Sequence, residues 1–516
     1  MKKAPLTLVL LGVFGISFSQ TTDSLATSNS RLLRNYENSL SLNPVQSLDL
    51  PFRDFTRSEL SFSSSERSSR PAQSAGKVMD LGFKTLGLIT LSKKFRAEGS
   101  VGYNYVEEKD AAFNLSANRP ETTELFSPHY LFVPKAGDFK HQQYHIRGSL
   151  LYKSGNLSFG TKARYESRSS VRTIDPRPEI ITADYGADLY GAYQIKEHQF
   201  SLGAGLSKET QNHDIENVNQ YINTPSNPEY FVRFSTGYGR VTNFPSFREF
   251  LYRTKEEKLF AGYRYRKNNT VLSVNYENLW SMENIYTQSA QGNVYIDPSL
   301  VDMKFRVKGH KLDLNTSWNS PSHRYLAGAR MQSLTGDNFS RSMEGQNYRS
   351  EKDQAEVFFQ SVPTLRDTFL DGFRIEALGT RERARDLLGV TDQKIQSVTL
   401  GAEVLKSIYR SAENHLTLSL GARQHIPLST SLEFSNASSS SSFYKGVILP
   451  NYQYQNLYRT YLTTGLSLTT AAFKDSRVEI FSNFAFEIKS GTLKPIAFAY
   501  PNRPNLAFAL GANLYY

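Results

Sequence analysis

Charged side chains alternate with apolar ones along several segments of this chain, and they are the residues best suited to act on a solute. In residues 156–167, Lys162, Arg164 and Glu166 fall on one parity while apolar residues fill the other. On a β-strand this alternation places the charges on a single face. The same pattern elsewhere adds Arg264, Arg266, Arg324, Arg330, Arg374, Glu376, Glu403, Arg423, Glu479 and Glu487.

Two roles are open for this set of charges. Rings of charged side chains set the selectivity of a pore. Charges of opposite sign can equally pair with one another and fill a closed interior. The sequence does not separate these two hypotheses.

No catalytic or metal-binding motif is recognisable. The chain has no cysteine, which excludes disulfides, thiolate metal sites and a cysteine nucleophile. The closest histidine pair, His141 and His145, would lie about 13 Å apart on a strand, at ~3.3 Å per residue, too far to share a metal readily. We therefore predict no catalytic, cofactor-binding or metal-binding residues. A barrel enzyme that assembles distant Ser and His groups is the third hypothesis.

Composition excludes two further classes. Hydrophobic residues make up 39% of the 516 residues, and only residues 5–18 approach the ~20 apolar residues of a membrane-spanning helix. The net charge of +11 comes from 60 basic and 49 acidic residues spread along the whole chain. This distribution does not predict a nucleic-acid partner.

The N-terminus has the pattern of an export signal. Lys2 and Lys3 precede an apolar core at residues 6–14, and small residues follow. We predict a signal peptide of residues 1–19, cleaved after Ser19, and export of the mature chain to the periplasm.

From about residue 57 onward the sequence pattern predicts long β-strands. Segments of roughly 9–15 residues alternate in polarity, which matches the ~9–11 residues of a transmembrane strand better than the 5–6 typical of globular proteins. The polar parity is rich in Gly, Ser, Thr, Asn, Arg and Glu, as in a wet barrel interior. The predicted fold is all-β, a transmembrane antiparallel β-barrel of the bacterial outer membrane with about 16–20 strands.

Connections between the strands are expected to alternate between short and long. A count of 20 strands requires 246–254 and 258–266 to be two strands around a turn at 255–257, and a change of parity within 304–318 suggests a bulge there. Long connections are expected near 108–138, 169–180, 213–228, 283–303, 334–352, 384–394, 425–452 and 489–504.

The barrel is predicted to occupy residues 56–516, after a tail at residues 20–55. The tail is rich in Ser, Thr, Asn and Leu without periodicity, and we expect it in the periplasm or in the barrel lumen. It is too short for the folded plug of a TonB-dependent receptor.

One proline-rich motif falls in a predicted external loop. Asp175, Pro176, Arg177 and Pro178 form a stiff turn. The turn either presents Arg177 to a partner or fastens the loop to the barrel.

The last strand carries the most specific pattern of the chain. Phe508, Leu510, Leu514 and Tyr516 share one parity, and the chain finishes on an aromatic residue. This resembles the C-terminal targeting signal of outer-membrane barrels, which implies recognition by the barrel assembly machinery.

These features together resemble a known family. The Ser-Phe-Ser-Gln end of the signal, the Tyr- and Phe-rich strands, the Asp-Pro-Arg-Pro loop and the Asn-Leu-Tyr-Tyr terminus are similar to an uncharacterised family of outer-membrane β-barrels of about 500 residues from Bacteroidota. The resemblance implies a gene near TonB-dependent receptors and their surface lipoproteins. It implies an accessory role in uptake or envelope assembly.

The leading hypothesis is an integral outer-membrane barrel that serves as an accessory or binding component of an uptake or envelope complex. The alternative is a porin-like diffusion channel for small solutes, and the third is a barrel-embedded hydrolase. Expected partners are outer-membrane lipid and lipopolysaccharide, the barrel assembly machinery, and a TonB-dependent receptor or surface lipoprotein.

Overall fold

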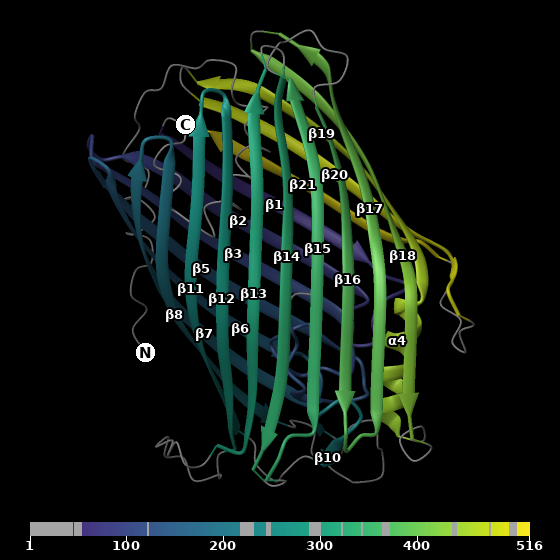
Figure 1. The fold of residues 1–516 in the computed structure, drawn as a ribbon. Coiled ribbons are helices and arrows are strands. Elements are labelled where there is room, and N and C mark those ends of the chain that lie inside the picture. Colours follow the sequence, from purple (N-terminus) through teal and green to yellow (C-terminus); the bar gives the residue numbers. More distant parts are fainter. Residues whose placement is uncertain are drawn as a thin grey trace, which may run out of the picture.

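The computed structural model of the chain is dominated by one barrel of long strands (Figure 1). It describes Val45 and residues 54–120, 123–216, 232–243, 249–287, 301–320, 323–341, 344–363, 372–411, 413–435, 441–473, 476–494 and 503–515. The predicted signal peptide lies outside these residues, as do all residues of the predicted tail except Val45, Asp54 and Phe55.

Eighteen strands of the described residues form a single antiparallel sheet. They are β1 (Phe55–Glu66), β2 (Lys77–Thr90), β3 (Phe95–Ala111), β5 (Gly137–Ser154), β6 (Leu157–Arg172), β7 (Arg177–Ile195), β8 (His198–Glu216), β11 (Glu249–Lys267), β12 (Thr270–Thr287), β13 (Met303–Asn319), β14 (His323–Ser340), β15 (Tyr348–Pro363), β16 (Gly372–Asp386), β17 (Thr391–Arg410), β18 (Asn414–Phe434), β19 (Leu457–Phe473), β20 (Ser476–Thr492) and β21 (Asn505–Tyr515).

The sheet closes on itself without a crossover. Each strand pairs with the next one along the chain, and the last pairs with the first, as in the register that sets Leu60 of β1 opposite Ala512 of β21. The strands run from 11 residues in β21 to 21 in β18, enough to cross a bilayer. Closure leaves no free sheet edge along the wall, which the hydrocarbon core of a membrane requires.

The outer face of this barrel is apolar. Along β6, Leu157 and Phe159 are exposed on the outside, while Lys162 and Arg164 alternate with them on the inside. Leu202 of β8 leaves 71% of its surface exposed, and many large apolar side chains of other strands do the same. In water such an apolar surface would be unfavourable. The chain is an integral outer-membrane β-barrel protein, and the predicted fold class and location are confirmed.

The two ends of the barrel differ. Short turns at 91–94, 155–156, 196–197 and 268–269 lie at one end, where β1 also begins and β21 finishes. We call this the turn end and the opposite one the loop end. In outer-membrane barrels the short turns face the periplasm and the longer loops face outward.

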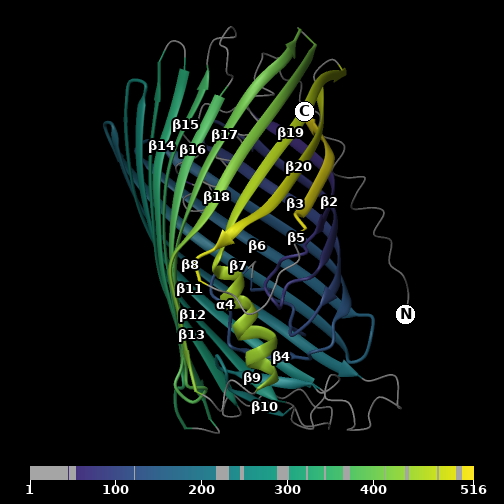
Figure 2. The same cartoon turned by 90° about the vertical axis from the view of Figure 1, so that its right-hand side faces the viewer.

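The loop end contains further elements beside the barrel wall. A small sheet is formed by β4 (His129–Phe132), β9 (Arg233–Thr236) and β10 (Val241–Asn243). The segment between β18 and β19 forms η6 (Tyr444–Ile448) and α4 (Leu449–Gln455). Figure 2 shows α4 and the small sheet at the same end of the barrel. Among the described residues, no helix is long and apolar enough to cross a membrane.

These elements pack into what we call the plug, formed by β4, β9, β10, η6 and α4. On one face of β4, Leu131 joins a buried cluster with Phe139 and Phe250 of the barrel wall. On the other face, Phe132 packs with Phe443, at 4.9 Å between ring centroids, beside η6. The small sheet is thus buried between the wall and η6.

The 18 barrel strands of the described residues fall within the predicted range of about 16–20, and the origin of one extra strand in the count of 20 can be identified. Residues 249–267 form the single strand β11, paired without interruption to β12. Lys255 and Glu257 form an ion pair on its outer side, and Glu256 faces inward to Lys258. Charges on both faces of β11 interrupt the alternation of apolar and polar residues, and for this reason the sequence pattern predicted a turn at 255–257.

The predicted bulge in 304–318 is also wrong. The pairs of β13 with β12 and β14 follow one register throughout. The parity changes because Phe305 faces inward, 6.4 Å from the ring of His129 in the plug. Two connections expected to be long, near 169–180 and 384–394, are short, since β6 reaches Arg172 and β16 and β17 are separated by 387–390 alone.

Candidate functional site

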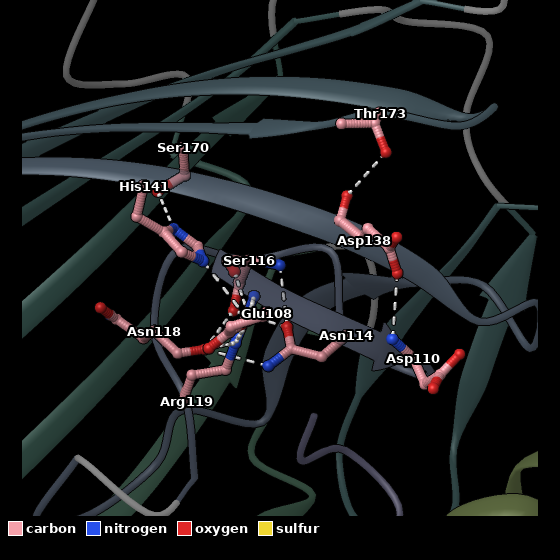
Figure 3. Close-up of polar contacts among 10 residues, drawn as sticks. All are labelled: Glu108, Asp110, Asn114, Ser116, Asn118, Arg119, Asp138, His141, Ser170 and Thr173. Carbon is pink, nitrogen blue, oxygen red and sulfur yellow. Dashed lines mark hydrogen bonds and ion pairs between the residues drawn. The ribbon is translucent and has the colours of Figure 1, made fainter. Parts of the chain in front are cut away.

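One polar cluster fastens the segment that follows β3, on the way to β4, to the barrel wall (Figure 3). Arg119 follows β3 and binds Glu108 of β3 through two nitrogens, with Nη2 2.7 Å from Oε2 and Nε 3.0 Å from the same oxygen. Arg119 also donates to the carbonyl of Ser116. Both charged side chains are largely buried, so this pair is a strong constraint on the segment.

The same cluster joins β3, β5 and β6. His141 Nδ1 lies 2.7 Å from Ser170 Oγ, and its Nε2 lies 3.3 Å from Glu108 Oε2. A serine, a histidine and a carboxylate in line can act in nucleophilic catalysis. Here Ser170 is fully buried, so a substrate cannot reach its hydroxyl. The arrangement positions the wall strands around Arg119.

A second buried polar cluster holds the small sheet against β14 and β15. The Asn338 amide donates to the carbonyl of Thr236 at 3.0 Å and lies 3.2 Å from His129 Nε2. Asn347 donates to Asp386 at 2.9 Å. Burial lowers the pKa of His129 to about 3, so its ring is neutral at physiological pH.

Sequence reasoning did not identify these two clusters. His141 was noticed only beside His145, and in the structure the two make different contacts, since His145 lies against Gly102. The described residues contain no group of three or more His, Asp or Glu side chains arranged for a metal ion. The buried contact between His129 and Asn338 joins residues that are 209 positions apart in the sequence, so no local spacing reveals it.

The predicted charges lie on the inward parity of their strands. Arg164 is 3.1 Å from Asp184 on β7 and 3.6 Å from Glu256 on β11. Glu166 pairs with Arg147, whose side chain is about half exposed inside the barrel. Lys162 lies beside them, partly buried.

A second series of ion pairs, which we call the charged chain, lies on β14–β18. Arg330 is 3.5 Å from Glu356, which is 3.0 Å from Arg374. Arg374 is 2.8 Å from Glu376, and Glu376 is 2.7 Å from Arg423. Cations and carboxylates alternate from β14 to β18, so this wall of the lumen is polar and close to neutral.

Two predicted carboxylates accept hydrogen bonds from neutral partners. Glu479 accepts from Asn513 at 3.0 Å and from Tyr515 at 2.6 Å. Glu487 accepts from Asn505 at 3.2 Å. The other predicted charges also lie on inward positions: Arg264, Arg266, Arg324 and Glu403.

The proline-rich motif lies at the loop end between β6 and β7. Asp175 is buried and accepts a 2.8 Å hydrogen bond from Nε of Arg177. The carbonyl of Pro176 accepts from the buried Arg172. Pro178 is the second residue of β7. These contacts fasten the loop to the wall, and Arg177 remains partly exposed.

The C-terminal strand closes the barrel through β1 and β20. Phe508 packs on Phe484 of β20 at 4.9 Å between ring centroids. Leu510 is exposed on the outer face, and Leu514 shares its parity. Tyr516 lies outside the described residues.

A cavity of about 520 Å³ lies inside the barrel between β1 and β16–β21. Its lining includes the charged residues Arg374, Glu376, Glu403 and Arg423. Small side chains such as Ser63, Thr463 and Ala507 line it on the adjoining strands β1, β19 and β21.

The fold is similar to several solved outer-membrane structures at low sequence identity. The siderophore receptor PiuA from Acinetobacter baumannii has 9% identity and a TM-score of 0.41, covering 90% of this chain and 82% of the receptor. The ferric-catecholate import receptor Fiu from E. coli K12 has 9% identity and a TM-score of 0.40, with the same coverages. A bacterial polysaccharide outer membrane secretin has 12% identity and a TM-score of 0.31, covering 90% of this chain and 99% of the secretin.

No curated protein matches the chain. A family model matches residues 44–516, the whole barrel and the residues just before it. As expected from the sequence, this family is an uncharacterised one: the chain belongs to the family of unknown function DUF6850.

Proposed function

We propose that this protein is an outer-membrane barrel closed at its outer end, which serves as an accessory or binding component of an uptake or envelope complex. The observation that carries this proposal is the plug. Leu131 and Phe132, on opposite faces of β4, are both fully buried. Burying an apolar side chain of this size contributes about 1.5–3 kcal/mol, so two such clusters favour the closed end strongly over an open one.

A surface for a partner is available beside the plug. The hairpin between β16 and β17 exposes Leu387, Leu388 and Val390, each with half or more of its surface free. The buried carboxylate of Asp386 accepts hydrogen bonds from the backbone of Leu388 and Gly389. These hydrogen bonds hold the turn in one conformation. Three apolar side chains exposed together on such a turn are more stable against a protein partner than in water.

The partner proposed for this surface is a TonB-dependent receptor or a surface lipoprotein. Outer-membrane lipid and lipopolysaccharide would surround the apolar wall, and the barrel assembly machinery would read the C-terminal strand. This choice of partner follows from the resemblance of the sequence, which implies an origin in Bacteroidota and a gene near such receptors and lipoproteins.

The N-terminal region is proposed to lie in the lumen. Val45 is fully buried against Tyr190, Ala192 and Phe260. These three side chains point inward from β7 and β11. A tail held there would narrow the lumen from the turn end.

A photo-crosslinker at position 388 in intact cells tests the proposed partner contact. We expect an adduct that contains a second outer-membrane protein, and we expect Asp386→Ala to reduce it because the turn loses its brace. The matched control is a crosslinker at position 91, since Leu91 is equally exposed at the turn end. Equal adducts at the two positions, or adducts with lipid alone, would contradict the proposal.

A porin-like diffusion channel is the second candidate, and the lumen favours it. The charged chain from Arg330 to Arg423 and the cavity beside it form a polar interior in a barrel wide enough to conduct. This role requires the plug to leave the lumen. Conductance of the intact protein distinguishes the two candidates.

A further inference from the structure

We infer that the lumenal cavity is a binding site for a neutral, hydroxyl-rich small molecule of about the size of a mono- or disaccharide. The inference goes beyond the proposed function and requires no partner at the outer face. It rests on the size of the cavity, on the chemistry of its lining and on the packing that keeps it open.

The cavity exists because lumenal side chains are small over neighbouring strands. Thr463 of β19, Ala485 of β20 and Ala507 of β21 are direct neighbours in the register, and Ser65 of β1 follows. Their outward neighbours, such as Leu462 and Phe486, are large. The residues of this wall are therefore small only on the lumenal side. The resulting volume of about 520 Å³ falls within the ~300–1,000 Å³ of typical small-molecule sites.

Two glycines on the adjoining strands β17 and β18 hold the charged part of the same wall in place. A Cβ atom at Gly401 would lie 2.8 Å from Cγ of Glu376 and 3.1 Å from Cγ of Arg423. A Cβ atom at Gly421 would lie 2.5 Å from Oγ1 of Thr463. The ion pair between Glu376 and Arg423 occupies the space that a side chain at 401 would need.

The positive and negative charges in this part of the wall balance, and most of them form ion pairs with one another. Arg374 binds both Glu356 and Glu376, while Arg423 reaches Glu376 through Nε. The Arg423 side chain is 59% exposed, so its terminal amino groups are accessible from the cavity. Two arginines and the carboxylates of Glu376 and Glu403 line the cavity, which leaves no formal net charge. A multiply charged ligand would meet a like charge as often as an opposite one.

The remaining polar groups both donate and accept hydrogen bonds. Ser63, Ser419, Thr463 and Asn483 supply hydroxyl and amide groups, and a sugar hydroxyl also donates and accepts. Tyr461 adds an aromatic ring, with its hydroxyl held by Arg459 at 2.9 Å. Balanced charge, bifunctional hydrogen-bonding groups and one ring together favour a neutral polyol over an ion.

Ligand-observed NMR on the folded, full-length mature protein tests this inference. The protein is prepared in a detergent without a sugar headgroup, and saturation transfer is recorded for glucose, maltose, glutamate and citrate. We expect signals from glucose or maltose and weaker signals from the two charged probes. Signals from glutamate or citrate with none from the sugars would overturn the inference, as would silence from all four probes.

Two substitutions locate the binding. Ala507→Trp fills the cavity, and Arg423→Gln replaces its exposed guanidinium with a neutral amide; each is expected to lower the sugar signal at least fivefold. Ala187→Trp adds the same bulk on the outer face of β7 and should leave the signal unchanged. Heat-shifted gel mobility establishes that each variant is folded. A sugar signal that persists in folded Ala507→Trp would place binding elsewhere and overturn the inference.

Discussion

Arg119 Nη2 lies 2.7 Å from Glu108 Oε2, and this ion pair ties the segment between β3 and β5 to the inner wall of the barrel. The Arg119 side chain is 6% exposed and that of Glu108 is 12% exposed. A pair so buried is costly to break, because the remaining charge is left without a partner.

Glu108→Gln is therefore expected to loosen the plug. Removing one member of a buried pair costs about 3–5 kcal/mol, and the variant should unfold at a lower urea concentration than the wild type. The matched control is Glu166→Gln, since Glu166 pairs with the half-exposed Arg147 and should contribute less than about 1 kcal/mol. Equal shifts for the two variants would contradict a special role for Glu108.

Asn338→Ala is expected to destabilise the contact between the small sheet and β14. The Asn338 side chain bonds Thr236, Asn347 and the backbone of Tyr348, and all of these contacts are buried. Each group left without a partner costs about 1–3 kcal/mol. Limited proteolysis from the outer face measures the result, and we expect faster cleavage within 232–243. Unchanged cleavage would show that this cluster does not hold the sheet.

Stability of the plug should decrease in acid. Burial lowers the pKa of His129 to about 3, whereas a released histidine titrates near 6.5. The released state thus binds more protons below about pH 6.5. The contribution of His129 is complete above that pH and is lost as the pH falls toward 3.

His129→Gln isolates this effect. The carboxylates connected to His129 by hydrogen bonds, Asp386 through Asn338 and Asn347 and Glu283 through Ser127, are present in both proteins and cancel in the comparison. Between pH 6.5 and 4.5 the wild type should lose roughly 2–3 kcal/mol more than the variant. Urea unfolding at both pH values measures this difference. Parallel losses would mean that His129 does not titrate on release.

The barrel could be predicted from the sequence because its signal is local. Leu157, Phe159 and their polar neighbours alternate within one strand, because the membrane favours apolar side chains at outward positions. The inward parity of the charges followed from the same alternation. Their pairing did not, because Arg374 meets Glu356 on a neighbouring strand through a register set by the whole barrel.

The plug could not be predicted for a related reason. β4 has four residues and β10 has three, too few for a periodic pattern. Its contacts join distant segments, as when His129 meets Asn338 or Phe132 meets Phe443. The one available signal was the parity change at Phe305, which we interpreted as a bulge. An apolar residue facing a polar lumen indicates instead that something packs against it there.

Single-channel conductance of the mature protein in a planar bilayer tests the closed outer end most directly. Protein shown by heat-shifted mobility to be folded should be silent, and Glu108→Gln should show intermittent openings because its plug is less firmly held. Stable, ion-selective steps from the folded wild type would contradict a closed barrel and would establish the channel.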